Sequence, residues 1–461
     1  MDTKTLRCGL LGRKLGHSYS PAIHERLADY SYRLFEVEPE DLGAFLQEGA
    51  FDGLNVTIPY KKYVIPYCAE LSDTARAIGA VNTLVRRADG TLWGDNTDAY
   101  GFSMLVQSSG ADIAGKKALV FGSGGASATA QYVLRQLGAR EVVVISRHGE
   151  DNYENLDRHA DAQIAVNTTP VGMYPNTGVS PVDLHRLPRL EAALDVVYNP
   201  ARTEFLLQAE ARGLRRANGL LMLAAQAKKS CEDFTGEPVD DAKIFSITKA
   251  LEAQMHNVIL IGMPGSGKTT IGTLVAKRLG RTFVDADSAL EREAGMPIPE
   301  IFRLEGEAGF RRRETAVLAE LGRQSGLVLA TGGGSVTREE NYPLLHQNGE
   351  IFCLQRALER LPSAGRPVSQ ALGAQTIYAQ RKQLYARFAQ LCAHESLCVG
   401  RAEAHLRVLV QVAPPLCKLR GKRLCFLHKP GRQHFVKIFH ILLPPSAATR
   451  KTARQKACAV F

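Results

Sequence analysis

The chain has 461 residues, too many for one ordinary hydrophobic core, and this length predicts two or three domains. Hydrophobic residues make up 45% and charged residues 23%, the balance of a globular protein in water, and we expect neither a secretory leader nor a membrane helix. The net charge of +10 arises in residues 414–461, which hold eleven Lys or Arg and no Asp or Glu. Without these eleven charges the net charge becomes −1, so the body of the chain does not suggest a nucleic-acid partner.

The nine cysteines are scattered along the chain, and no two have CxxC spacing. Their number is odd. This pattern is typical of free thiols in a reducing cytoplasm and argues against a disulfide framework or a zinc site. We therefore expect a cytoplasmic protein.

The first hundred residues alternate short apolar strands with helical stretches. A compact strand follows at 116–121 (KKALVF), then the loop GSGGAS at 122–127, a helix to about Leu137 and a strand at 141–145. This strand–turn–helix–strand unit is expected in an open parallel sheet, which residues 164–166 and 193–197 would extend.

Helices are predicted over residues 219–256, and a second unit opens directly at Asn257. It consists of the strand NVILIG, a Gly-rich loop, a helix and the strand RTFVDAD. We place a domain boundary near His256. The sequence thus predicts an α/β protein with two different Gly-rich loops, each between a strand and a helix.

The loop after the first compact strand could hold a pyrophosphate, because its glycines let the backbone approach and the next helix presents free N–H groups. The loop alone leaves a simple tight turn open, since Ser127 stands where Gly or Ala is usual. Arg147 ends the next strand, where NAD enzymes place an acid. As a cation it favours the 2′-phosphate of NADP, although a solvated arginine is the alternative. The predicted cofactor-binding positions are Gly122, Ser123, Gly124, Gly125, Ala126 and Arg147.

Seven further motifs follow one another along the first 250 residues. They are HSYSP (17–21), NVTIPYK (55–61), AVNT (80–83), GDNTDAYG (94–101), NTTPVGM (167–173), DVVYNP (195–200) and NGLLMLAAQA (218–227). Each alone could be a polar turn, but the ordered set resembles shikimate dehydrogenase.

The resemblance implies a role for each matching position. Lys61 and Asp98 would form the catalytic pair, because hydride reduction of a ketone leaves an alkoxide that needs a proton. Gly219 and Met222 would line the nicotinamide pocket. The substrate would be bound through its carboxylate and ring hydroxyls by Ser18, Ser20, Asn55, Thr57, Asn82, Asp98, Tyr198 and Gln226. One departure is the short polar stretch between Arg147 and Asn167, which leaves little room for a full βα unit.

The second loop, GMPGSGKT at 262–269, matches the G-x-x-x-x-G-K-[ST] phosphate loop completely. Lys268 would reach the β and γ phosphates, and Thr269 would offer its hydroxyl to magnesium. The motif predicts nucleotide binding and not a particular reaction. The positions it assigns to the nucleotide are Gly262, Gly265, Ser266, Gly267, Lys268, Thr269 and Thr270.

Three more motifs, VDAD (284–287), GEAGFRRRE (306–314) and TGGGSV (331–336), complete a set that resembles shikimate kinase over about residues 257–411. The resemblance gives shikimate to Asp287, Arg311, Arg381 and Gly332, Gly333 and Gly334. Asp287 would orient or deprotonate the 3-hydroxyl, Asp285 would hold magnesium, and Arg366 would be the lid arginine. The lid departs from the family, because GRPV stands at 365–368 and no proline precedes Leu384-Tyr385.

We therefore predict four regions: a substrate lobe at 1–101 completed by 219–256, a Rossmann-like NADP lobe at 102–218, a P-loop kinase of the nucleoside-monophosphate-kinase type at 257–411, and a basic tail at 412–461. We interpret the tail as a disordered extension or an out-of-frame end, with polyanion binding as the alternative.

The predicted ligands are 3-dehydroshikimate, shikimate, NADP(H), ATP and magnesium, without a membrane or nucleic-acid partner; the oligomeric state stays open. Two other interpretations remain. One is a quinate/shikimate dehydrogenase fused to the kinase. The other is a metabolite-sensing regulator, which predicts eroded catalytic positions that this chain does not have.

Overall fold

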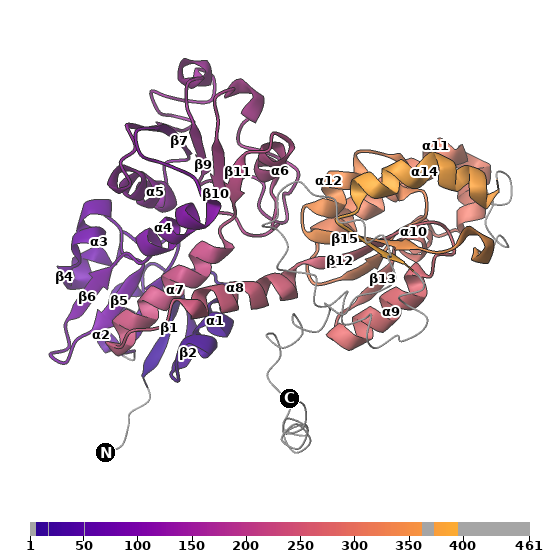
Figure 1. Ribbon diagram of the computed structural model, residues 1–461. Coiled ribbons are helices and arrows are strands. Elements are labelled where there is room, and N and C mark those ends of the chain that lie inside the picture. The colour runs from indigo at the N-terminus through magenta and orange to yellow at the C-terminus, as the bar shows by residue number, and fades with distance from the viewer. Residues whose placement is uncertain (1–5, 17, 50, 362–372, 395–461) are drawn as a thin grey trace, which may run out of the picture. The chain divides into compact units, whose positions relative to one another are not determined.

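The computed structural model describes residues 6–16, 18–49, 51–361 and 373–394 (Figure 1). The predicted tail at 412–461 and the lid residue Arg366 lie outside these ranges. Three β-sheets with flanking helices follow one another along the described chain, so the predicted α/β class is confirmed.

The first sheet is mixed and has six strands in the order β2-β1-β3-β5-β6-β4. Strand β1 pairs in parallel with β2 and β3, whereas β5 pairs antiparallel with β3 and β6. The strands are β1 Arg7–Gly12, β2 Ser31–Glu36, β3 Gly53–Val56, β4 Cys68–Leu71, β5 Thr83–Arg86 and β6 Leu92–Asp95. The intervening helices are α1 Ser20–Leu27, α2 Leu42–Glu48, the 3-10 helix η1 Ile65–Tyr67 and α3 Asp73–Ile78.

Two helices from much later in the sequence complete the core of this sheet. Apolar side chains of α7 (Leu220–Thr235) and α8 (Ala242–Met255) share one buried cluster with Cys8, Ile23 and Leu27. Helix α7 ends at Gly236, whose φ of +72° is a left-handed conformation that glycine adopts without strain. The chain therefore leaves the first sheet, forms the second and returns.

The second sheet is fully parallel, with the order β11-β10-β9-β7-β8. Its strands are β7 Lys117–Phe121, β8 Glu141–Ile145, β9 Ile164–Asn167, β10 Ala192–Asp195 and β11 Arg215–Ala217. Its helices are α4 Asp98–Ser109, α5 Gly125–Gln136, α6 Glu204–Ala211 and the 3-10 helices η2 Leu156–His159 and η3 Leu184–Arg186. Strand β7 is buried throughout, as expected for a central strand covered on both faces.

One detail of the second sheet agrees with the sequence expectation and one differs from it. The link between β8 and β9 contains η2 and no α-helix, as its shortness predicts. The strand expected at 193–197 lies at Ala192–Asp195, because the Val197 N–H donates to Asp195 Oδ1 at 2.9 Å and leaves the ladder.

The third sheet is also parallel, with the order β13-β14-β12-β15-β16. Its strands are β12 Asn257–Ile261, β13 Phe283–Asp285, β14 Val328–Ala330, β15 Gly349–Gln355 and β16 Leu391–His394. The helices are α9 Lys268–Leu279, α10 Ala286–Ala294, α11 Ile298–Arg323, α12 Asn341–His346, α14 Ala374–Phe388 and the 3-10 helices η4 Ser335–Thr337 and η5 Leu358–Arg360. Helix α11 is kinked at Gly306, where φ is +66°.

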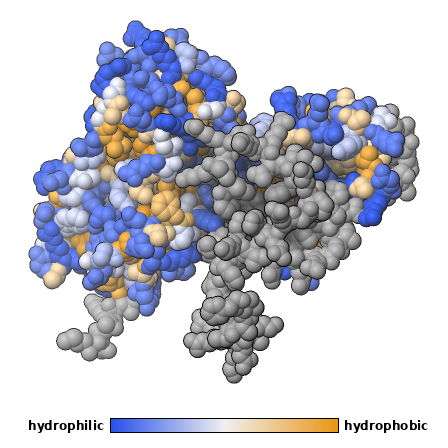
Figure 2. All heavy atoms as spheres, in the orientation of Figure 1, coloured by the Kyte–Doolittle hydropathy of each residue, from blue (hydrophilic) through white to orange (hydrophobic). Residues whose placement is uncertain are grey.

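Arg202, which follows β10, hydrogen-bonds to residues just before and at the start of β15. Arg202 donates to the His346 carbonyl at 2.9 Å and pairs with Glu350 at 2.7 Å. On the face shown in Figure 2, hydrophilic residues cover most of the described surface. Among the helices of the described ranges, none has both the length and the apolar composition that crossing a membrane requires.

Candidate active sites

The first Gly-rich loop lies where the strand order of the second sheet reverses. It follows β7, and the neighbouring strand β9 runs into Thr168 and Thr169 at the same edge, which is where open α/β sheets bind ligands. At Gly122 φ is +105°, and a Cβ would lie 2.9 Å from the Thr169 side chain. Around Gly124 a Cβ would meet no atom within 4 Å. The loop is therefore bare backbone with open space beside it.

Helix α5 begins at this loop without a side chain that caps its N-terminus. Its first N–H groups consequently face the open space and can donate to a phosphate, in accord with the helix dipole. The residues present here are compatible with a dinucleotide pyrophosphate. Arg147 is exposed just beyond the end of β8, with Tyr153 nearby.

The predicted catalytic pair is assembled. Lys61 Nζ lies 2.5 Å from Asp98 Oδ2, and both side chains are largely buried. Asp98 is the first residue of α4, where a negative charge interacts favourably with the helix dipole. The Lys61 side chain also reaches within 3.9 Å of where a Cβ of Gly125 would lie. The ion pair therefore adjoins the cofactor loop.

The residues predicted to bind the substrate carboxylate cluster at the start of α1. Ser20 begins this helix, and its N–H donates to Ser18 Oγ at 3.2 Å. Tyr198, from the loop after β10, packs its ring edge to face against Tyr19, with centroids 6.2 Å apart. Burial raises the pKa of Tyr198, so its hydroxyl stays protonated and can donate a hydrogen bond.

The residues predicted to bind ring hydroxyls lie at the carboxyl ends of β3 and beside β5. Asn55 and Asn82 are buried, and the Thr57 N–H donates to the Leu11 carbonyl at 2.9 Å. Gln226 donates one N–H of its side-chain amide to the Leu223 carbonyl of its own helix at 2.9 Å. The second N–H and the amide oxygen are left for a ligand.

Gly219 and Met222, predicted beside the nicotinamide, lie at the beginning of α7. A Cβ on Gly219 would overlap the Val196 carbonyl, so a larger residue cannot occupy this position without moving the loop after β10. Met222 contacts α4 at Gly101, one turn beyond Asp98. Helices α4 and α7 thus bring these predicted residues together.

The second Gly-rich loop has the backbone of a phosphate cradle. Gly262, Gly265 and Gly267 have φ of +143°, +82° and +92°, and α9 begins at Lys268 directly after them. Lys268 Nζ donates to the carbonyls of Gly262 and Met263 at 3.0 and 3.1 Å. The Ser266 hydroxyl is buried and has no hydrogen-bond partner among the described residues. These donors and this helix terminus suit nucleotide phosphates.

Thr269 and Asp285 supply oxygen atoms next to this loop. Thr269 Oγ1 donates to Asp285 Oδ2 at 2.8 Å. Mg²⁺ prefers hard oxygen ligands, and it needs few of them from the protein when phosphates and waters complete its coordination shell. In the described ranges no three His, Cys, Asp or Glu gather as a metal site.

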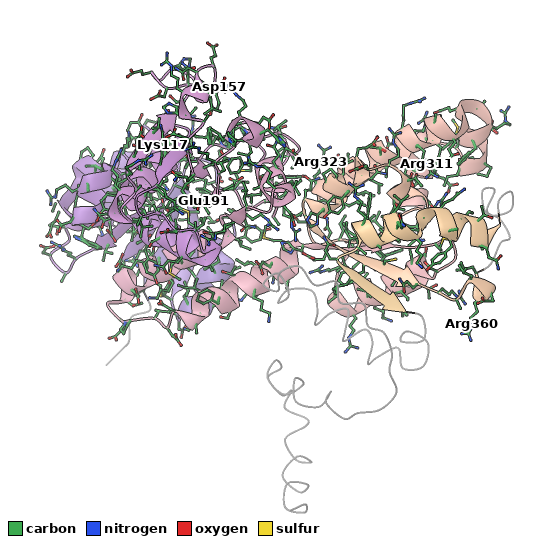
Figure 3. All side chains as sticks on the ribbon, turned by 45° about the horizontal axis from the view of Figure 1, so that its top comes forward. Lys117, Asp157, Glu191, Arg311, Arg323 and Arg360 are labelled. Carbon is green, nitrogen blue, oxygen red and sulfur yellow. The ribbon has the colours of Figure 1, made fainter. Side chains whose placement is uncertain are left out.

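The predicted acceptor residues surround the TGGGS loop after β14. A Cβ on Gly332 would lie 2.7 Å from Asp287 Oδ1, and one on Gly334 would overlap the Arg311 guanidinium. Arg311 belongs to α11 and is labelled in Figure 3. Arg381 Nη1 donates to the Gly333 carbonyl at 3.0 Å. A larger residue at Gly332 or Gly334 would have to displace these side chains.

Glu314 belongs to this cluster and was missed from the sequence. It pairs with Arg311 at 2.7 Å and is 2% exposed. The spacing Arg-x-x-Glu on a helix could have indicated it. Burial, Glu314 and Asp285 together raise the pKa of Asp287 to about 6, with partial compensation from Lys268 and Arg311. Arg366 cannot be placed, because it lies outside the described residues.

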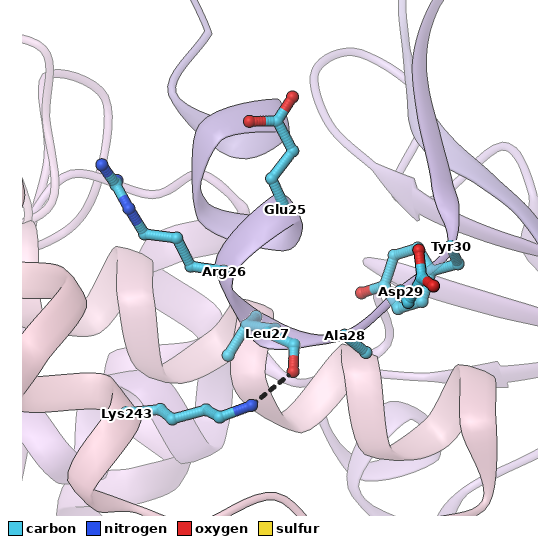
Figure 4. Close-up of a pocket in the computed structure, with 7 residues that line it drawn as sticks. All are labelled: Glu25, Arg26, Leu27, Ala28, Asp29, Tyr30 and Lys243. Carbon is cyan, nitrogen blue, oxygen red and sulfur yellow. Dashed lines mark hydrogen bonds between the residues drawn. The ribbon is translucent and has the colours of Figure 1, made fainter. Parts of the chain in front are cut away.

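A separate surface pocket lies at the end of α1, where Lys243 Nζ donates to the Leu27 carbonyl at 2.7 Å (Figure 4). Its lining contains none of the predicted site residues, so it belongs to neither candidate site.

Comparisons with known proteins find two families along the chain. Residues 10–84 match the shikimate dehydrogenase substrate binding domain, and residues 264–405 match the shikimate kinase family. Shikimate dehydrogenase (NADP(+)) of Clostridium perfringens is 36% identical in an alignment of 267 residues, and the alignment covers 53% of this chain and 98% of that protein. Its counterpart in Synechocystis is 36% identical over 48% of this chain and 88% of its own length.

Among solved structures, a chorismate mutase/shikimate 5-dehydrogenase fusion protein from Clostridium acetobutylicum is similar to this chain, with a TM-score of 0.52 and 36% identity. The match covers 54% of this chain and 98% of that one.

Proposed function

Because the chain belongs to the shikimate dehydrogenase family and carries a shikimate kinase domain after it, we propose that it catalyses two consecutive reactions. The first is 3-dehydroshikimate + NADPH + H⁺ ⇌ shikimate + NADP⁺. The second is shikimate + ATP → shikimate 3-phosphate + ADP. Both act on the same ring oxygen, since reduction makes the hydroxyl that is then phosphorylated.

The Lys61–Asp98 pair beside the cofactor loop carries the first assignment. NADPH supplies the hydride when bound. Lys61 Nζ donates a proton to the ketone oxygen as negative charge develops there, and the Asp98 carboxylate holds the ammonium group in place. Ser18, Ser20 and Tyr198 hold the carboxylate of the ring, and Asn55, Thr57, Asn82 and Gln226 hold its oxygens.

The phosphate loop beside Asp287 and Arg311 carries the second assignment. ATP supplies the phosphoryl group. Arg311 and Arg381 bind the shikimate carboxylate, and Asp287 orients or deprotonates the 3-hydroxyl. Lys268 and Arg366 neutralise charge on the phosphates, and Thr269 and Asp285 hold magnesium. Positioning and charge neutralisation are the main contributions that a protein makes to this chemistry.

We also propose the domain bounds, the cytoplasmic location and the preference for NADP given above. The scattered cysteines support the location; Cys8, Cys68, Cys231 and Cys353 carry free thiols in the structure. Arg147 supports NADP over NAD and, with it, shikimate over quinate as the physiological substrate.

A coupled assay tests the function. The full chain is given 3-dehydroshikimate, NADPH and magnesium–ATP, and the product is identified by mass spectrometry. We expect shikimate 3-phosphate, with shikimate as the intermediate when ATP is left out. If neither shikimate nor its phosphate forms, the proposed function is wrong; if shikimate accumulates with ATP present, the kinase assignment fails.

A further inference from the structure

A buried polar network lies beneath the two asparagines of the dehydrogenase site. It joins Asn55 in β3, Asn82 just before β5, Thr83 in β5, Thr97 just before α4, and Ser230 in α7. All five side chains are 5% exposed or less. Ser230 is 175 positions from Asn55 in the sequence, so the network exists only in the folded chain.

The orientation of the Asn82 amide follows from a group that can only donate. The Thr97 backbone N–H lies 2.7 Å from Asn82 Oδ1, so this atom must be the oxygen. The amide nitrogen then donates to Thr97 Oγ1 at 3.1 Å. Asn82 has a second N–H, for which the described residues offer no acceptor.

Asn55 is held from both ends. Its Oδ1 accepts a hydrogen bond from the Tyr32 hydroxyl at 2.8 Å, and its Nδ2 donates to Ser230 Oγ at 2.7 Å. The contact from Nδ2 to Thr83 Oγ1 is long, at 3.4 Å. One N–H of Asn55 therefore also remains available for a stronger acceptor.

Ser230 connects the two asparagines. Besides the bond to Asn55, its hydroxyl lies 2.9 Å from Thr97 Oγ1 and 3.0 Å from Thr83 Oγ1, and both threonines hydrogen-bond to Asn82. Ser230 is also four residues after Gln226 and eight after Met222, so all three share one face of α7. The helix thus supports the nicotinamide side and the substrate side of the site together.

We propose that Ser230 is a positioning residue of the dehydrogenase. Its hydroxyl fixes the amides of Asn55 and Asn82 so that each presents an N–H to an oxygen of the substrate ring. The ring atoms at these two places must then act as hydrogen-bond acceptors. The inference rests on the proposed reduction of 3-dehydroshikimate and adds a residue to it that the sequence did not indicate.

The test compares Ser230→Ala and Ser230→Cys with the wild-type chain. A thiol nearly keeps the volume of the side chain but is a weak hydrogen-bonding group, so the two variants separate lost hydrogen bonds from lost packing. We expect the KM for 3-dehydroshikimate to rise about tenfold in both, the effect of weakened hydrogen bonds to the substrate. The kcat should change much less, because Lys61 and Asp98 are untouched, and the KM for NADPH should stay the same.

Two controls come from the same chain. The Ser230 hydroxyl also donates to the carbonyl of Gln226, four residues earlier, at 2.9 Å. Thr248→Ala removes a buried hydroxyl that makes the same kind of bond, to the Ile244 carbonyl, on α8 and away from the network. It should leave the KM for 3-dehydroshikimate unchanged. The melting temperature and the kcat of reduction at saturating substrate report whether each variant still folds.

A double-mutant cycle separates positioning from a general structural effect. In an Asn55→Ala background, Ser230→Cys should raise the KM by less than tenfold, since one of the two amides that Ser230 positions is gone. An equal rise in both backgrounds, or a wild-type KM in Ser230→Cys, overturns the proposal. A wild-type chain that does not reduce 3-dehydroshikimate overturns the proposed function and this inference with it, whereas an active wild type leaves the variants to decide on Ser230 alone.

Discussion

At the scale of residues, two aspartates have different surroundings that suit different tasks. Asp98 forms a 2.5 Å ion pair with Lys61, which keeps the lysine in place as a proton donor. Asp287 lies beside Glu314 and Asp285, and its pKa is raised to about 6. A carboxyl group can take the proton of a hydroxyl only when it is ionised, so the protonation of Asp287 should control the kinase.

The first prediction concerns this titration. Because the pKa of Asp287 is raised, the carboxyl group becomes neutral as the pH falls through about 6, and kcat/KM for shikimate should fall with it. Glu314→Gln removes a negative charge that raises this pKa, so the acid limb of the profile should move to lower pH. The measurement is kcat/KM for shikimate against pH at saturating magnesium–ATP.

Glu307→Gln is the matched control. Glu307 also contacts Arg311, at 3.2 Å, but its side chain is 62% exposed and it does not act on the pKa of Asp287. Its acid limb should coincide with that of the wild type. An acid limb that is the same in all three proteins would show that Asp287 is not the titrating group.

A second prediction concerns cofactor choice. Arg147 is exposed just beyond the end of β8, where a cation can reach a 2′-phosphate. Arg147→Ala should raise the KM for NADPH about tenfold or more, the effect of one lost hydrogen bond between charged groups, and leave the KM for NADH nearly unchanged. Arg140→Ala, on the residue just before the same strand, is the control. Equal use of both cofactors by the wild type would refute the assignment.

The site residues that could be predicted were those in local motifs, such as the phosphate loop or VTIPYK. Ser230 could not be found in this way. Ser230 acts through Asn55, 175 positions away, and nothing near it in the sequence shows the contact. Likewise, no pattern indicates that the Gln226 amide turns to its own helix. Such roles depend on tertiary packing.

At the scale of elements, the crossing of α4 and α7 holds the dehydrogenase site together. A Cβ at Gly101 would lie 2.6 Å from the Met222 carbonyl and 3.1 Å from the Gln226 Cβ. The glycine lets the helix with Asp98 lie against the helix with Met222, Gln226 and Ser230. The distance between these helices therefore sets the geometry of catalytic and binding residues together.

Gly101→Ala tests this. The added methyl group meets backbone and must push the helices apart, which typically costs about 1–3 kcal/mol of stability. We expect a lower melting temperature and a lower kcat for reduction, with phosphorylation of added shikimate retained. Gln107→Ala, at an exposed position of the same helix, should change neither. Normal reduction by Gly101→Ala would mean that the crossing does not set the geometry.

The order of the elements was predictable because each Gly-rich loop follows an apolar strand and precedes a helix. The residue at which β10 ends was harder to predict from the sequence. The apolar run continues through Val197, but Asp195 takes the Val197 N–H with its side chain and turns the chain out of the sheet. Local side-chain competition for backbone groups of this kind is not visible in a hydrophobic pattern.

At the scale of the whole molecule, the two chemistries use different residues on different sheets. Lys61 follows β3 and Asp98 follows β6, both strands of the first sheet, whereas Lys268 follows β12 of the third sheet. The motifs were sufficient to predict this division, since each set is contiguous in sequence. They do not explain residues 412–461, which match neither set. The interpretation of these residues as an extension without a role in either site stays a prediction.

The last prediction is that each activity can be removed alone. Lys61→Ala should lower the kcat of reduction about 10²- to 10⁴-fold, the contribution of a general acid, and leave phosphorylation of added shikimate intact. Lys268→Ala should lower phosphorylation about 10²- to 10³-fold, because charge on the transferring group is no longer neutralised, and leave reduction intact.

The exposed neighbours Lys62 and Lys277 provide alanine controls that should keep both activities. A mixture of the two inactive variants should still convert 3-dehydroshikimate to shikimate 3-phosphate, because shikimate can diffuse from one chain to the other. If either single variant loses both activities while its melting temperature is unchanged, the two sites depend on each other and the division proposed here is wrong.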